Sequence, residues 1–198
     1  WIRSLLRVPL GIQTMTHRRK LPSWQFDAPR PKIRGGRISL RPLPFMGRNY
    51  FTDILDPTTW CRWLNDPEVR LHLESKGRWT PARLSAWLKA NQAARIFAIN
   101  VDYRPVGTMK LDGVEKAGWA SLGLMIGDTS VWGRGVGAWA IEIACRRAKL
   151  AGCFGVWAGI REANVASSRA FDKAGFQVVG RSEDGSVKFW PPFGSARW

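Results

Sequence analysis

The strongest constraint on the fold is a run of three alternating glycines, Gly133, Gly135 and Gly137, at the end of a polar loop. An apolar strand pattern at 119–126 precedes the loop, and a helical pattern at 135–151 follows it. Glycine lets the backbone take positive φ and come close to a ligand. The first N–H groups of a helix have no partner inside the helix, and the helix dipole adds positive potential there. The sequence therefore predicts a strand, an anion-binding turn and a helix in immediate succession.

Arg134 lies within this turn and is expected to add a charge-assisted donor for a phosphate group. The G-x-x-x-x-G-K-S/T motif of P-loop NTPases is absent from the sequence. The alternating glycines also lack the final gap of the G-x-G-x-x-G dinucleotide motif. A tight strand-to-helix connection without a ligand is the alternative interpretation of the same residues.

The positive charge of the chain is divided between two parts. The 198 residues carry 31 Lys and Arg against 15 Asp and Glu, a net charge of +16, which suggests polyanionic neighbours. Residues 1–37 hold half of that excess in a proline-containing stretch without helical or alternating period, so we expect a basic, disordered arm there. A membrane-surface turn, a targeting peptide and an arm without function are the alternatives for it. Residues 38–198 form the expected domain.

Several functional classes are excluded by residue usage. No stretch of about 18 apolar residues exists, so we expect no transmembrane segment. The three cysteines are odd in number and fit no C-x-x-C pattern, which favours reduced thiols and a cytoplasmic location. The two histidines are too few for a His-rich metal site, and no G-x-S-x-G elbow accompanies them. We therefore expect no bound metal. The protein is also expected to be a monomer or a homodimer.

Apolar periodicity after residue 37 predicts one α+β (mixed α/β) domain with a central, twisted and mostly antiparallel sheet. About four helices and six to seven strands are expected. The predicted strands are 38–42, 96–101, 106–114, 119–126, 154–160, 176–181 and 187–190. The predicted helices are 57–65, 81–94, 135–151 and 165–174, the first ending at Asn65-Asp66-Pro67.

A second motif follows the glycine turn at residues 164–176, where Asn164 is expected to cap a short helix that Gly175 ends. The two motifs in this order resemble the GNAT acyltransferase superfamily. The turn is similar to its Q/R-x-x-G-x-G/A loop, and the second motif to its N-x-x-S-x-x-x-Y/F-x-x-x-G-F segment. The stretch Trp63–Val69 resembles the W-x-N-D-P-x-V sequence of the branch that includes ribosomal-protein and polyamine acetyltransferases. The resemblance covers about residues 38–190.

This resemblance implies an acetyl-CoA-dependent N-acetyltransferase in which the fourth and fifth strands, near 122–126 and 154–160, splay apart around the pantetheine arm. The implied donor-binding residues are Met125 and Ile126 for the pantetheine amides, Gly133, Arg134, Gly135, Gly137 and Ala138 for the pyrophosphate, and Asn164 with Ser167 beside the pantetheine. The implied chemistry is direct attack of an amine on the thioester, with a backbone N–H near Met125 stabilising the oxyanion.

The catalytic acid and base depart from the family pattern. The position of the usual Glu base is Ser121, and the usual thiolate-protonating Tyr is Phe171, which has no proton to donate. Trp132 stands where the loop usually has Gln or Arg. Ser121 and Ser168 are the catalytic candidates. Asp128 and Glu162 are weaker ones, because Glu162 is equally consistent with a solvated loop position.

The expected acceptor is a primary amine of a small molecule or of a protein N-terminus. Two other hypotheses come from the same sequence. One is a nucleic-acid- or ribosome-binding module acting through the basic arm, although no RRM, KH or zinc-finger signature supports base readout. The other is an acyl-CoA-binding domain without catalysis, suggested by Ser121 and Phe171. For Trp60, Trp63, Trp79 and Trp87, helix packing is favoured over acceptor selection.

Overall fold

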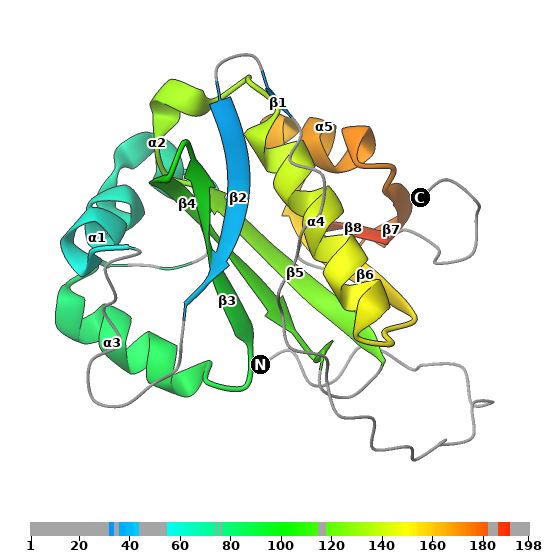
Figure 1. Cartoon of the computed structure of the whole chain (residues 1–198), viewed down its shortest axis with the longest axis horizontal. Helices are drawn as coiled ribbons and strands as arrows, with labels where there is room; N and C mark the ends of the chain where they lie inside the picture. Colours follow the sequence, from blue (N-terminus) through cyan, green and yellow to red (C-terminus); the bar gives the residue numbers. More distant parts are fainter. Residues whose placement is uncertain are drawn as a thin grey trace.

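A computed structural model describes residues 32–33, 36–43, 55–73, 75, 77–114, 118–181 and 186–190. Eight strands of these residues form one sheet in the order β1-β2-β3-β4-β5-β6-β8-β7 (Figure 1). All neighbouring strands are antiparallel except the pair β5 and β6, which is parallel. The strands are β1 (Lys32–Ile33), β2 (Gly36–Pro42), β3 (Arg95–Val101), β4 (Arg104–Asp112), β5 (Trp119–Ile126), β6 (Gly155–Arg161), β7 (Gln177–Arg181) and β8 (Ser186–Trp190).

Helices cover both faces of this sheet (Figure 1). The helices are α1 (Pro57–Asn65), α2 (Pro67–Arg70), α3 (Pro81–Ala90), α4 (Val136–Leu150) and α5 (Val165–Lys173). Helix α4 packs on β2, β4, β5 and β6 and against α5, and α1 packs against α2 and α3. Two apolar cores result, one under α4 and α5 and one under α1 and α3. No helix in the described part of the chain is long and apolar enough to cross a membrane.

The predicted fold class is confirmed, and the predicted strands agree closely with the observed ones. The prediction of six to seven strands is slightly too high for the central part of the sheet, which consists of the five strands β2 to β6. With the edge strands β1, β7 and β8 included, the sheet has eight strands. The prediction missed α2, because Asp66-Pro67 ends one helix and starts another. The Asp66 carboxylate accepts hydrogen bonds from the N–H groups of Glu68 and Val69. Residues 1–31 lie outside the described residues, and β2 begins at Gly36.

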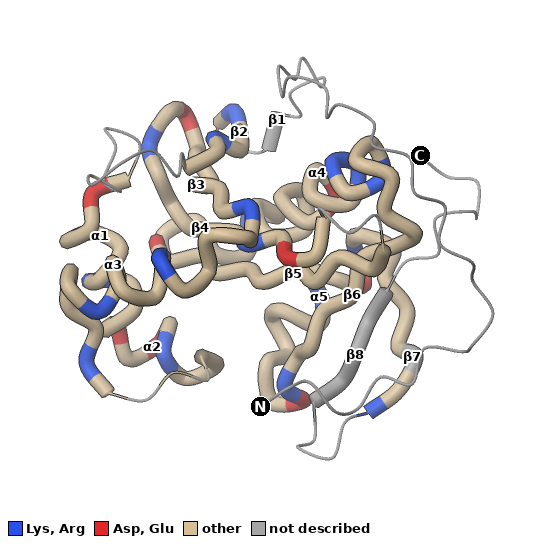
Figure 2. The backbone as a smooth tube through the Cα atoms, turned by 90° about the horizontal axis from the view of Figure 1, so that it is seen from below, with Lys and Arg blue, Asp and Glu red and all other residues tan. Residues whose placement is uncertain are grey.

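Basic residues stand in the last turn of every described α-helix (Figure 2). They are Arg62, Arg70, Lys89, Arg147 with Lys149, and Lys173. A cation at a helix C-terminus stabilises the helix by about 0.3–1 kcal/mol through the helix dipole. Part of the positive charge of the domain therefore has a structural reason that involves no ligand.

The motif residue Asn65 fastens α1 to the segment that leads into α3. Its Nδ2 donates to the carbonyl of Trp79 at 2.8 Å, and its Oδ1 accepts from the N–H of Trp79 at 2.8 Å. The backbone of a residue fourteen positions away is thereby held by a single side-chain amide. The Asn65 side chain thus sets the position of the Trp79 indole, which is buried.

We predict that Asn65→Ala lowers the free energy of unfolding by about 1–3 kcal/mol, because two hydrogen bonds are lost and their partners stay half-buried. Urea denaturation measures this change. The control is Gln92→Ala at an exposed position, which should change the free energy by less than about 0.5 kcal/mol. Equal effects of the two substitutions would contradict this role for Asn65.

Candidate functional site

The central feature of the site is the point where β5 and β6 separate. Their parallel pairing covers only three residue pairs, Trp119 with Gly155 through Ser121 with Trp157. Beyond that point, residues 158–161 of β6 pair with β8 instead. Residues 122–126 of β5 keep their pairing with β4 and have no partner strand on the other side. A wedge-shaped opening with an unpaired backbone edge is the result, as the family resemblance implied.

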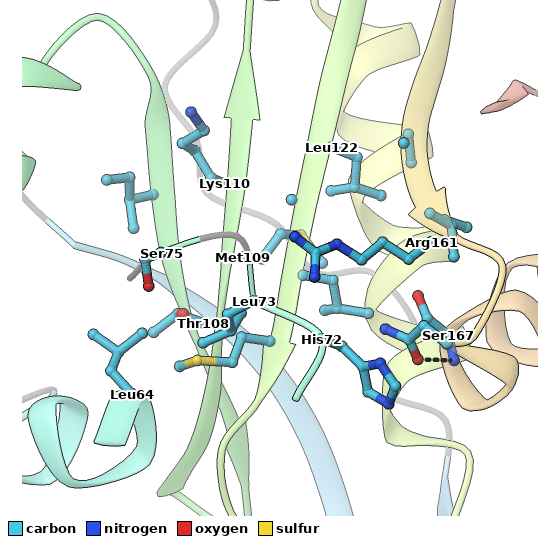
Figure 3. A pocket seen from close by; sticks show the side chains of 18 of the residues that line it. Leu64, His72, Leu73, Ser75, Thr108, Met109, Lys110, Leu122, Arg161 and Ser167 are labelled. Carbon is cyan, nitrogen blue, oxygen red and sulfur yellow. Dashed lines mark hydrogen bonds between the residues drawn. The ribbon is translucent and has the colours of Figure 1, made fainter. Parts of the chain in front are cut away.

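A cleft of about 390 Å³ lies over this opening (Figure 3). Its floor consists of residues 108–110 of β4, 122–125 of β5 and 158–161 of β6. One wall is aromatic and includes Trp60, Trp79 and Trp87. The other wall comes from α5 and its N-cap and includes Asn164, Ser167 and Phe171. His72 and Ser75 also line the cleft, from the segment that follows α2.

The glycine turn follows β5 and leads into α4. Gly133 and Gly135 have φ values of 74° and 84°, a left-handed conformation that residues other than glycine rarely adopt. A Cβ atom on either residue would find no heavy atom within 4 Å, so the turn presents open space on that side. Gly135 is the N-cap of α4 and provides no side-chain cap. The first N–H groups of α4 are therefore available for an anion.

Four hydrogen bonds and one ion pair fix the loop between β5 and the turn. The carbonyl of Val106 accepts hydrogen bonds from the N–H groups of both Gly127 and Asp128. The Asp128 carboxylate accepts from the Ser130 N–H at 3.0 Å and forms an ion pair with Arg104 at 2.9 Å. The indole Nε1 of Trp132 donates to the carbonyl of Ile126 at 3.0 Å. Trp132, which departs from the family pattern, thus closes the loop onto the end of β5.

The Trp63 ring lies directly against Gly127, at the start of the same loop. A Cβ atom at position 127 would overlap this ring. Trp63 itself is buried, so the ring has little room to move. The W-x-N-D-P-x-V stretch is therefore a set of structural contacts: Trp63 packs on the loop, Asn65 holds Trp79, and Asp66 caps α2.

A family model of the acetyltransferase (GNAT) domain matches residues 51–177, which is more than half of the chain. The chain belongs to the GNAT acetyltransferase family. The resemblance inferred from the two motifs is thereby confirmed. A search among curated protein sequences finds no match.

Solved structures of GNAT proteins share the fold at low sequence identity. RimJ of Mycobacterium smegmatis, solved with CoA-disulfide, has 17% identity and a TM-score of 0.67 over 84% of this chain and 87% of its own. The spermidine N-acetyltransferase of Vibrio cholerae, solved with CoA and spermine, has 12% identity and a TM-score of 0.63. The alignment covers 78% of this chain and 95% of that protein. The aminoglycoside acetyltransferase AAC(6')-Ib, solved with coenzyme A, has 15% identity and a TM-score of 0.63. The alignment covers 79% of this chain and 95% of that protein.

The predicted donor-binding residues of this GNAT domain fall into two adjacent groups. Met125, Asn164 and Ser167 line the cleft, and the Asn164 Oδ1 accepts from the Ser167 N–H at 3.0 Å, which caps α5 as predicted. The other group forms the turn and the start of α4 and consists of Gly133, Arg134, Gly135, Gly137 and Ala138. Ile126 ends β5 outside the cleft lining, and its carbonyl accepts from the Trp132 indole. A Cβ at Gly137 would lie 3.6 Å from Leu124 and 3.7 Å from Ala170, which are ordinary van der Waals distances, so packing does not require glycine there. Ala138 is buried, so only its backbone is suited to bind a ligand.

The four catalytic candidates lie outside the cleft lining. Ser121 stands in the paired part of β5, opposite Asp112 and Trp157, and Ser168 is half-buried in α5. Asp128 holds the loop, and Glu162 forms an ion pair with Arg181. None of these positions brings a base directly to the opening, and their catalytic roles stay predictions.

Five polar residues of the cleft were not singled out from the sequence: His72, Ser75, Thr108, Lys110 and Arg161. Figure 3 shows His72 and Ser167 at the same end of the cleft and the Arg161 side chain extending from β6 into the opening. They come from three separate segments and share no spacing. Strand alternation was the available signal for Lys110 and Arg161, because both fall on the face opposite the apolar residues that pack under α4.

We predict that Gly127→Ala lowers the free energy of unfolding by about 1–3 kcal/mol, because the added methyl group overlaps the buried Trp63 ring. Denaturation in urea is the measurement. Gly159→Ala is the matched control, since a Cβ at that position of β6 meets nothing within 4 Å. If both variants are as stable as the parent protein, Trp63 does not restrict the loop.

Proposed function

We propose that this GNAT domain transfers the acetyl group of acetyl-CoA to a primary amine, on a small molecule or a protein N-terminus, by direct attack on the thioester. The opening between β5 and β6, joined at its end to the glycine turn, is the observation that carries the proposal. The solved relatives that contain coenzyme A have the same fold and support it.

The shape of the site fits an extended thioester ligand with a phosphate end. The unpaired edge of residues 122–126 offers backbone N–H and C=O groups to the amides of a pantetheine arm. The carbonyl of Ile126 already accepts from Trp132, so it keeps one lone pair for such an amide. The turn at Gly133 and Gly135 leads to the N-terminus of α4, where Arg134 is exposed beside it for a pyrophosphate.

Direct attack agrees with the state of the cysteines. Cys61, Cys145 and Cys153 are all buried and form no disulfide with one another, and none of them lines the cleft. Burial raises the pKa of the Cys145 thiol to about 12, and burial also raises the pKa of Cys61. A thiolate nucleophile is thus disfavoured at both sites at neutral pH. Nothing in the described cleft supports an acetyl-cysteine intermediate.

His72 is the residue that we assign as the general base. Within the described cleft lining, His72 provides the one imidazole, a side chain that can accept a proton. The other basic side chains there are those of Lys110 and Arg161, which carry a positive charge. In the step, the amine nitrogen forms a bond to the thioester carbon and passes a proton to the His72 imidazole. The C–S bond then breaks, and its electron pair leaves with the thiolate. A backbone N–H near Met125 stabilises the oxyanion formed in between.

Calorimetric titration with acetyl-CoA, followed by a thiol-release assay with a panel of amines, tests the function. Binding and release with at least one amine support it. Absence of acetyl-CoA binding would overturn it and leave the hypothesis of nucleic-acid binding through residues 1–37. Binding without release for any amine would instead favour the acyl-CoA-binding domain without catalysis.

Arg134→Gln should weaken acetyl-CoA binding by about threefold to tenfold, because an exposed guanidinium on a pyrophosphate contributes on the order of 1 kcal/mol. The dissociation constant from calorimetry is the quantity compared. Arg146→Gln removes the same charge from an exposed position of α4 and should leave it unchanged. A similar loss in both variants would point to net charge and not to the turn.

His72→Ala should lower kcat by about 10²–10⁴-fold while the affinity for acetyl-CoA stays the same, because proton transfer is lost and the donor site is intact. Added imidazole should restore part of the rate. A structural role for His72 would show itself differently, as a lower stability without any rescue by imidazole.

A further inference from the structure

The charge of the cleft is one-sided. Its described lining contains Lys110 on β4 and Arg161 on β6, and it contains no Asp or Glu. The two strands lie on either side of β5, whose edge faces the opening. Both cationic side chains stand on the sheet face that carries α1 and α3, where the amine acceptor would enter. An incoming molecule therefore meets positive charge from two sides.

The chain itself neutralises this charge only in part. The Lys110 Nζ donates to the Asn91 Oδ1 at 3.0 Å and lies 3.7 Å from Asp112, a residue outside the cleft lining. Arg161 is exposed and forms no ion pair with the residues that the structure describes. Figure 3 shows its side chain reaching into the opening. Its guanidinium is thus positioned to bind an anion bidentately.

The aromatic wall offers little compensation for a cationic acceptor. The Lys110 Nζ lies 5.9 Å from the ring centre of Trp87, and the Arg83 guanidinium lies 4.5 Å from that of Trp79. One face of each of these two rings, out of the three in the wall, is therefore already covered by a cation of the chain itself. A polyamine or an aminoglycoside would bring several positive charges into a cleft whose described lining holds no carboxylate. Repulsion between these charges and the cations of the cleft disfavours such an acceptor.

We propose that the acceptor is a primary amine that carries a carboxylate close to the amine, with Arg161 binding the carboxylate and Lys110 supporting it. This inference rests on the acetyl transfer proposed above. The same two positive charges disfavour the protonated form of the amine and so favour the neutral form that attacks the thioester. Selection of the acceptor and preparation of the nucleophile then have one electrostatic cause.

Matched acceptors that differ only in one negative charge test the proposal. The full chain is assayed for thiol release from acetyl-CoA with Ala-Glu-Ala amide against Ala-Gln-Ala amide, with alanine against alaninamide, and with spermine. We expect the acidic member of at least one pair to have a kcat/KM about tenfold higher or more. Spermine should be the poorest acceptor. High salt should reduce the difference within the pair.

The variant Arg161→Gln should lower the ratio of kcat/KM between the acidic and the neutral acceptor about tenfold and leave the dissociation constant of acetyl-CoA unchanged. The rate with the neutral acceptor should fall much less than the rate with the acidic one. Arg146→Gln on α4 is the matched control and should keep the ratio. Preference for spermine, or an unchanged ratio in Arg161→Gln, would overturn the inference while the acetyl transfer stands. An equal loss of rate with both partners, together with weaker acetyl-CoA binding, would also overturn it and place Arg161 in the donor site.

Calorimetric titration with the same peptides, without acetyl-CoA, separates this inference from the proposed function. If no amine is acetylated but the acidic peptide binds more tightly than its amide, and Arg161→Gln removes the difference, the recognition stands and the catalysis fails. Equal binding of the two peptides to a protein that turns over neither overturns both.

Discussion

The structure depends on the early end of the pairing between β5 and β6. A parallel pair in the middle of a sheet normally continues along both strands, because each unpaired backbone group that is removed from water raises the free energy of the fold. Here β6 leaves β5 after three residue pairs and pairs with β8 on its other side. The free edge of β5 lies between two helical layers and not at the rim of the sheet. Water or a ligand must satisfy it, and that requirement defines the site.

Local sequence patterns were sufficient for the framework of the fold. Alternation of apolar residues predicted the strands, and Asn164 was predicted to cap a helix whose cap the structure contains. Asp56 and Thr80, each directly before a proline, cap α1 and α3 in the same way. The short helix α2 was missed because Pro67 lacks an N–H, which suits both the end of one helix and the first turn of another. The left-handed glycines at 133 and 135 were predictable, since the turn needs positive φ.

The cleft residues could not be predicted in the same way. His72, Lys110 and Arg161 come from a loop, a strand and the end of another strand, and only the assembled sheet brings them together. The amide of Asn65 belongs to a recognised motif, yet its hydrogen bonds to Trp79 depend on how the chain returns after α2. The tryptophans Trp60 and Trp79 pack in the core as favoured from the sequence, and the same rings also form a wall of the cleft.

The contact between Trp63 and Gly127 joins the two parts of the site that we propose bind different molecules. Trp63 belongs to α1, which also carries Trp60 on the acceptor side, and Gly127 begins the loop that leads to the α4 N-terminus. Because the ring fills the space above the loop, a shift of α1 changes the room available to the loop, and the reverse holds as well. Thermodynamic linkage makes any such coupling reciprocal. If the two substrates bind as proposed, one indole ring gives each of them a route to affect the affinity of the other.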